Sequence, residues 1–201
     1  EYSRVLAERG RLEPGGARRP APTTADVPSM RIAARQTGGI VACWLRRSFG
    51  SRARGRFGIL LFHRIAPCPA GVPPPSHNVT PDRFREQITG LLDRGFTVAR
   101  LDDLLEAGRR RRALPPGTFA ITFDDAYEAV YRYAWPVLRE LGLPATVFVS
   151  TAFLDRPEPF PFDGWAHRYW ERVPAGVYRP IGAIQCREMA ASGLVTLGAH
   201  T

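Results

Sequence analysis

The stretch Thr118-Phe119-Ala120-Ile121-Thr122-Phe123-Asp124-Asp125 sets the expected fold of this chain. Its first six residues are uncharged and are mostly β-branched, aromatic or small, which is typical of a strand buried on both faces of a parallel sheet. Two adjacent carboxylates follow at once. Because the carboxyl ends of parallel strands carry ligands and catalytic groups in α/β domains, the stretch predicts a central strand with a polar site at its end.

Strands and helices alternate on both sides of that stretch. Short apolar runs predict further strands at 57–62, 96–99, 145–149 and 194–199, and amphipathic or capped segments predict helices at 80–95, 101–112, 126–141 and 185–191. The 57–62 run is expected to be fully buried, and Pro136 is expected to kink or restart its helix. Five strands that alternate with helices indicate a parallel α/β architecture, either a barrel or an open sheet.

Composition separates a basic leader from a nearly neutral body. Residues 1–57 contain twelve Arg against four acidic residues, whereas the rest of the chain contains 16 Arg against 15 acidic residues. Residues 1–29, rich in Pro, Gly and Arg, are expected to be disordered because they bury too little apolar surface to offset the entropy of ordering. Residues 30–56 are expected to form a basic linker with a short helix, and residues 57–201 the folded domain. The start at Glu1 predicts a fragment or a processed product.

Neither a membrane span nor a disulfide framework is predicted. The longest apolar run of the leader, 40–45, is much shorter than the roughly 20 residues that a span requires. The three cysteines are widely spaced and predict isolated thiols. No convincing signal peptide precedes the domain, so the compartment stays open, with a cytoplasmic or membrane-peripheral location favoured. No nucleic-acid partner is expected, and the oligomeric state stays open.

Three polar positions follow the ends of predicted strands: His63, the pair Asp124 and Asp125, and His200. Because parallel strands end at one edge of a sheet, these side chains are expected to converge on one pocket. Carboxylates and an imidazole can hold a divalent cation while one carboxylate stays free as a base. The alternatives are structural, since an Asp can cap the next helix and a His can be a buried residue bound to a carbonyl. Two histidines in predicted loops are given no role: His77 and His167.

Four segments of the chain resemble the polysaccharide deacetylase (NodB-homology) family, carbohydrate esterase family 4. The segment 121–127 (ITFDDAY) is similar to the first signature of that family, and 197–201 (LGAHT) resembles the opening of its second signature, His-Ser/Thr-x-x-His. The segment 144–149 (PATVFV) is similar to the next strand, and 61–64 (LFHR) resembles the first strand of the exopolysaccharide N-deacetylase branch. Four ordered matches make a more specific signal than any one of them.

The resemblance also implies a role for each matching residue. Asp124 would be the general base, Asp125 and His200 would bind a divalent metal, most often zinc, and His63 and Tyr127 would contact the substrate. The implied fold is a distorted (β/α) barrel, of which this chain would hold only the N-terminal part, truncated after five strands and open at one edge. The second histidine ligand and a general acid would lie beyond the last residue. Ala126 stands where the family more often has Gly.

A metal-dependent hydrolase that removes N-acetyl or O-acetyl groups from a polysaccharide or amino-sugar glycan is therefore expected, although the 201-residue chain alone is expected to be inactive. Four aromatic residues of the segment 151–184 either offer faces for sugar rings or pack as a lid: Trp165, Tyr169, Trp170 and Tyr178. One alternative is a divalent-metal sugar-nucleotide glycosyltransferase, although no nucleotide-binding loop follows the first strand. Another is a non-catalytic fragment whose Arg-rich leader binds anions.

Overall fold

The computed structural model describes residues 57–200. The predicted disordered leader and the predicted basic linker both lie outside this range. No helix in the described range combines the length and the apolar character that a bilayer crossing requires.

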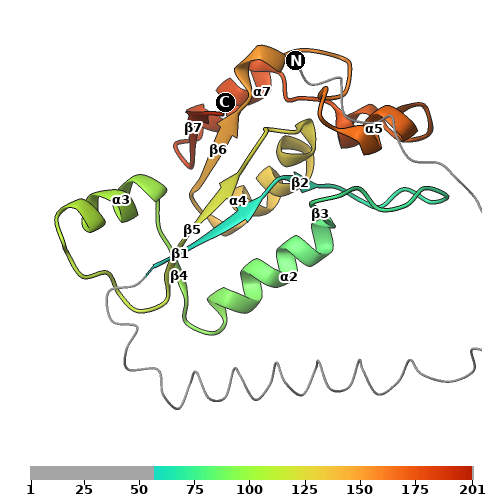
Figure 1. The fold of residues 1–201 in the computed structure, drawn as a ribbon. Coiled ribbons are helices and arrows are strands. Elements are labelled where there is room, and N and C mark those ends of the chain that lie inside the picture. The colour runs from blue at the N-terminus through green and yellow to red at the C-terminus, as the bar shows by residue number, and fades with distance from the viewer. Residues whose placement is uncertain (1–56, 201) are drawn as a thin grey trace, which may run out of the picture. The chain divides into compact units, whose positions relative to one another are not determined.

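A five-stranded parallel sheet forms the centre of the described residues (Figure 1). Four strands lie side by side in the order β1 (Gly58–Phe62), β5 (Thr118–Phe123), β6 (Ala145–Val149) and β7 (Val195–Ala199). The short β4 (Thr97–Val98) pairs with the beginning of β5. All these pairings are parallel, so the strands end at one edge of the sheet. The predicted parallel α/β architecture is confirmed.

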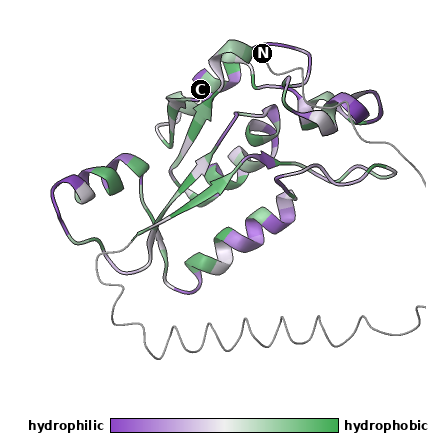
Figure 2. Ribbon diagram, in the orientation of Figure 1, coloured by the Kyte–Doolittle hydropathy of each residue, from purple (hydrophilic) through white to green (hydrophobic). Residues whose placement is uncertain are grey.

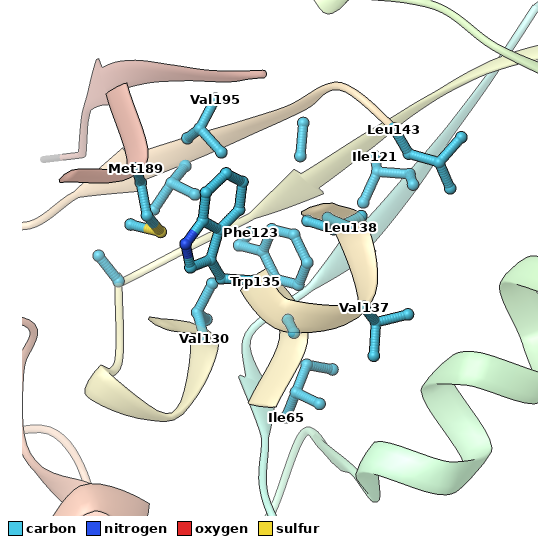
Figure 3. Packing of buried hydrophobic residues seen from close by; sticks show 14 of the residues in the cluster. Ile65, Ile121, Phe123, Val130, Trp135, Val137, Leu138, Leu143, Met189 and Val195 are labelled. Carbon is cyan, nitrogen blue, oxygen red and sulfur yellow. The ribbon is translucent and has the colours of Figure 1, made fainter. Parts of the chain in front are cut away.

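The strand β5 is buried along its whole length, as its sequence predicts. All six of its residues are buried, and the alternation of a pleated strand puts Phe119, Ile121 and Phe123 on one face, in the main hydrophobic core. Figure 3 shows Trp135 beside Phe123 and Met189 within this core.

Three helices contribute buried side chains to the same core: α2 (Pro81–Leu92), α4 (Trp135–Leu141) and α7 (Ala183–Ala191). Most of the exposed residues of α2 are polar, whereas the strands of the sheet are mostly apolar (Figure 2). The helix α2 begins as predicted, because the Thr80 side chain accepts a hydrogen bond from the Arg83 N–H at 3.4 Å and Pro81 occupies the first turn. The helix α3 (Leu101–Arg109) buries Leu104 near the amino-terminal end of β5.

The prediction that the first strand is fully buried is wrong. Ile59 and Leu61 are 49% and 54% exposed, while Leu60 and Phe62 pack against the main core. Within residues 57–200, β1 pairs with β5 alone and is an edge strand, and the face that carries Ile59 and Leu61 is not covered. An edge strand and a central strand of a parallel sheet can share one apolar composition, and local sequence does not distinguish them.

The helix predicted for residues 126–141 begins later than expected. Ala126 and Tyr127 are not helical. Glu128 and Ala129 begin the helix, η2 (Val130–Ala134) is a π-helix, and α-helix resumes with α4. Pro136 lies in the first turn of α4, which confirms the predicted restart. A proline lacks the N–H of a regular helix and clashes with the carbonyl four residues earlier, and the wider π turn accommodates it.

The segment 151–184 forms short helices at the carboxyl ends of the strands (Figure 1). These are η3 (Thr151–Phe153), α5 (Gly164–Tyr169), η4 (Trp170–Arg172) and α6 (Ala175–Tyr178). Phe160 and Val177 of this segment are fully buried against Tyr127 and Ala66. The segment therefore has a small core of its own and forms one side of the cavity that lies at the strand ends.

Candidate active site

Asp124 and Asp125 lie where the chain leaves β5 in a sharp turn. The Asp124 N–H donates to the Phe62 carbonyl at 2.8 Å and so extends the pairing of β1 with β5. Asp125 and Ala126 then adopt left-handed conformations, with φ of 67° and 60°. Each such residue costs on the order of 1–3 kcal/mol when it is not glycine. This strained turn allows two neighbouring carboxylates, which would face opposite sides of a regular strand, to lie near one partner.

That partner is His200, at the end of β7. The backbone N–H of His200 donates to the Val149 carbonyl at 2.9 Å, which extends the pairing of β6 with β7. Its Nε2 lies 3.8 Å from Oδ2 of Asp124 and 3.9 Å from Oδ1 of Asp125. Both distances are too long for direct hydrogen bonds. Residues 75 positions apart in the sequence thus meet at one edge of the sheet.

A cavity of about 690 Å³ opens beside these residues. Among its lining residues are Asp125, Tyr127, His63 and His200, together with His77 from the loop before β3 (Asn78–Val79). The imidazole rings of His63 and His77 stack with their centres 5.1 Å apart. His77 lies in a loop, as predicted, and the fold of this loop brings it to the cavity.

The charges around Asp125 act in opposite directions on its acidity. Burial raises the pKa of Asp125, and the charge of Asp124 raises it further, whereas His63 and His200 favour the ionised form. The net effect is a raised pKa. A cation next to this carboxylate would favour its ionised form, so the position suits a group that binds positive charge.

Arg64 and Asp163 form a buried ion pair in the cavity wall, with side chains only 2% and 4% exposed. The Tyr127 hydroxyl donates to Asp163 at 3.1 Å, and the Arg64 guanidinium lies 4.1 Å from the centre of the Tyr127 ring. Burial raises the pKa of Tyr127, so its hydroxyl stays protonated and remains a donor. Asp163 also caps α5 by accepting the Ala166 N–H at 3.0 Å. The network joins β2 (Arg64–Ile65) to the aromatic segment.

The donor atoms fit a divalent metal only in part. Oxygen from Asp125 and nitrogen from His200 are ligands that zinc accepts, and their separation of 3.9 Å leaves room for an ion about 2 Å from each. A catalytic zinc usually has three protein ligands. Within residues 57–200, however, no group of three His, Cys, Asp or Glu side chains is arranged to hold a metal. The described residues therefore offer part of a metal site.

The residues proposed from sequence lie together, and the fold adds others. His63, Asp125, Tyr127 and His200 all line the cavity, and Asp124 lies next to His200. Further lining residues come from loops and carry no sequence signal that marks them: His77, Phe162 and Asp163. None of the four aromatic residues that either offer faces for sugar rings or pack as a lid lines the cavity: Trp165, Tyr169, Trp170 and Tyr178.

The arrangement defines the class of protein: an α/β domain with a parallel sheet whose strand ends carry a carboxylate pair beside a histidine. NodB-type deacetylase domains are of this class. Residues 111–201 match the family model described as polysaccharide deacetylase, and the chain resembles this family.

Relatives and solved structures show the same similarity. The chain is 27% identical over 124 residues to poly-beta-1,6-N-acetyl-D-glucosamine N-deacetylase of Escherichia coli K12, a match that covers 62% of this chain and 18% of that protein. It resembles the structure of IcaB from Ammonifex degensii with a TM-score of 0.57 and 26% identity, over 72% of this chain and 52% of that one. A de-N-acetylase from Aggregatibacter actinomycetemcomitans shares the fold at 24% identity and a TM-score of 0.56, over 72% of this chain and 54% of that one.

Proposed function

We propose that this chain is part of a metal-dependent enzyme that hydrolyses N-acetyl groups of a β-1,6-linked N-acetylglucosamine polymer. The observation that carries the proposal is the position of His200 Nε2, within 3.9 Å of both carboxylates at the end of β5. The named relatives support the choice of polymer. Since the chain spans 18% of the Escherichia coli relative and about half of IcaB, the activity of the whole protein is part of the proposal.

Amide hydrolysis requires an activated water, a base and a proton for the leaving amine. Asp125 and His200 would hold a divalent ion, zinc by their chemistry, and a further ligand would come from outside residues 57–200. When bound, such an ion lowers the pKa of a water molecule from 15.7 to about 7 and polarises a carbonyl.

Asp124 is the base in this proposal. Its side chain is 22% exposed and lies 3.8 Å from His200, so it is open to solvent on one side and close to the metal-binding residues on the other. A positioned base contributes about 10²–10⁴-fold to the rate. His63 lines the same cavity and would contact the substrate, and the group that protonates the leaving amine would come from outside residues 57–200.

The test uses the full-length protein with β-1,6-linked N-acetylglucosamine oligomers and measures released acetate. Asp124→Asn should lower kcat by about 10²-fold or more while metal content stays unchanged. Asp125→Ala should lower both activity and zinc content, measured by elemental analysis. Asp102→Ala, at an exposed position of α3, is the matched control and should change neither.

Two results would contradict this proposal. The first is full zinc content in Asp125→Ala, which would remove this carboxylate from the metal site. The second is a wild-type protein that releases no acetate from the oligomers although it is folded and loaded with zinc. If the protein releases acetate from O-acetylated xylan instead, its substrate is an O-acetyl group and the proposed N-acetyl specificity is wrong.

A further inference from the structure

An exposed phenylalanine lines the cavity that contains Asp125 and His200. Phe162 is 58% exposed, the highest value among the exposed large aromatic residues of the described range. Single exposed apolar residues on a protein surface are ordinary. Of the large apolar residues exposed within 57–200, however, Phe162 alone lines this cavity. Its position therefore points to a binding role.

Neighbouring aromatic rings fix the orientation of Phe162. The ring of Phe160 stacks on it with a centre-to-centre distance of 5.0 Å and an angle of 18° between the planes. Phe153 contacts it edge-on at 6.5 Å and 88°. Phe160 itself is fully buried and packs edge-on against Tyr127 at 4.9 Å. One face of Phe162 is thus covered by a buried ring, and its large exposure comes from the rest of the ring, including the other face.

We propose that Phe162 is a stacking platform for a pyranose ring of the polymer, at a subsite next to the sugar that loses its acetyl group. This inference rests on the proposed function. A hexosamine with equatorial substituents has a flat face of C–H groups, and those positively polarised hydrogens match the negative face of an aromatic ring. Cavities of 300–1,000 Å³ enclose ligands of drug size, so 690 Å³ exceeds what an acetamide group alone requires.

Two of the four aromatic residues that the sequence offers either as sugar-binding faces or as a lid are engaged elsewhere. The Trp165 indole N–H donates to the Pro73 carbonyl at 2.7 Å, which ties the ring to a neighbouring loop. Tyr178 is buried in a small core with Ala166 and Val173. Phe162 stacks on one side only, is exposed and lines the cavity, so the platform is assigned to this residue.

The test compares substrates of different length on the full-length protein. Phe162→Ala should raise KM for a β-1,6-linked N-acetylglucosamine pentamer about tenfold, with a change of less than about twofold in kcat/KM for the monosaccharide. Phe162→Tyr and Phe162→Trp retain a flat ring and should keep a low KM for the pentamer. Phe162→Leu retains apolar bulk without a ring and should resemble the alanine variant. Leu105→Ala, an exposed position of α3 outside the cavity, should match the wild type.

Three outcomes would overturn the platform. One is an unchanged KM for the pentamer in Phe162→Ala. Another is an equal loss for pentamer and monosaccharide, which would place Phe162 at the reacting sugar. A third is an equal loss in Phe162→Tyr together with a lower unfolding midpoint, which would indicate packing of the segment instead. If the wild type releases no acetate at all, the proposed function fails, and calorimetric binding of the pentamer to wild type and Phe162→Ala still decides the role of this residue.

Discussion

At the scale of single residues, the buried pair Arg64 and Asp163 is expected to dominate the response to mutation. Asp163→Asn leaves the Arg64 charge buried without a partner, since both side chains are almost fully buried. The expected loss is about 3–5 kcal/mol in the free energy of unfolding, measured by chemical denaturation. Combining Asp163→Asn with Arg64→Met should restore part of that loss, because the uncompensated charge is removed.

The exposed ion pair of Arg85 and Glu140 is the matched control for this prediction. Nη2 of Arg85 lies 2.6 Å from Oε2 of Glu140, but the two side chains are 42% and 59% exposed. Glu140→Gln should leave the unfolding midpoint nearly unchanged, because solvent screens the pair. If Asp163→Asn and Glu140→Gln have equal effects, burial of the first pair does not control its energetics.

The acid dependence of stability should reflect Glu128. Burial favours the neutral form of this side chain, but hydrogen bonds from Arg179 and Arg132 outweigh burial and lower its pKa. A lowered pKa in the folded state contributes stability above the unfolded pKa of about 4.3, and this stability is lost as pH falls through the folded pKa. Unfolding free energies measured between pH 7 and pH 3 should thus decrease more steeply for the wild type than for Glu128→Gln. Parallel curves would show that Glu128 has no part in this dependence.

At the scale of elements, the close approach of β6 and β7 explains why a glycine precedes the site histidine. A Cβ atom built on Gly198 would lie 2.6 Å from Cδ1 of Phe148 on the neighbouring strand. Gly198→Ala should therefore displace the end of β7 and lower the free energy of unfolding by about 1–3 kcal/mol. Because His200 follows two residues later, acetate release by the full-length protein should fall as well.

Gly108→Ala is the control for that substitution. Gly108 lies in α3, and a Cβ atom there would have no neighbour within 4 Å. The alanine should stabilise the helix by up to about 1 kcal/mol. Equal thermal stability of the two variants would show that the contact with Phe148 is relieved without cost.

At the scale of the whole molecule, the sheet has an exposed edge at β1. Ile59 and Leu61 are exposed there, and within residues 57–200 the strand pairs only with β5. Unpaired apolar edge strands associate with one another. A fragment comprising residues 57–201 should therefore self-associate, as measured by light scattering, and Leu61→Lys should reduce this association. Leu105→Lys adds the same charge on α3, and an equal reduction by that variant would exclude a specific role of the edge.

The sequence by itself determined the central strands and the positions at which polar residues leave them. The strands β5 and β6 have the predicted bounds, and β7 differs by one residue, because apolar runs and turn residues act over short distances. The placement of His63, Asp124, Asp125 and His200 at strand ends follows from the same local pattern. The chemical roles of these residues remain predictions.

Only the tertiary structure decided which other groups join them. The edge position of β1, the left-handed turn at Asp125 and the arrival of His77, Asp163 and Phe162 at the cavity could not be read from local patterns. They depend on how the segment 151–184 and the loop before β3 fold back on the strand ends. The physical reason is that such contacts join residues far apart in the sequence, and their strength depends on burial, which exists only in the folded chain.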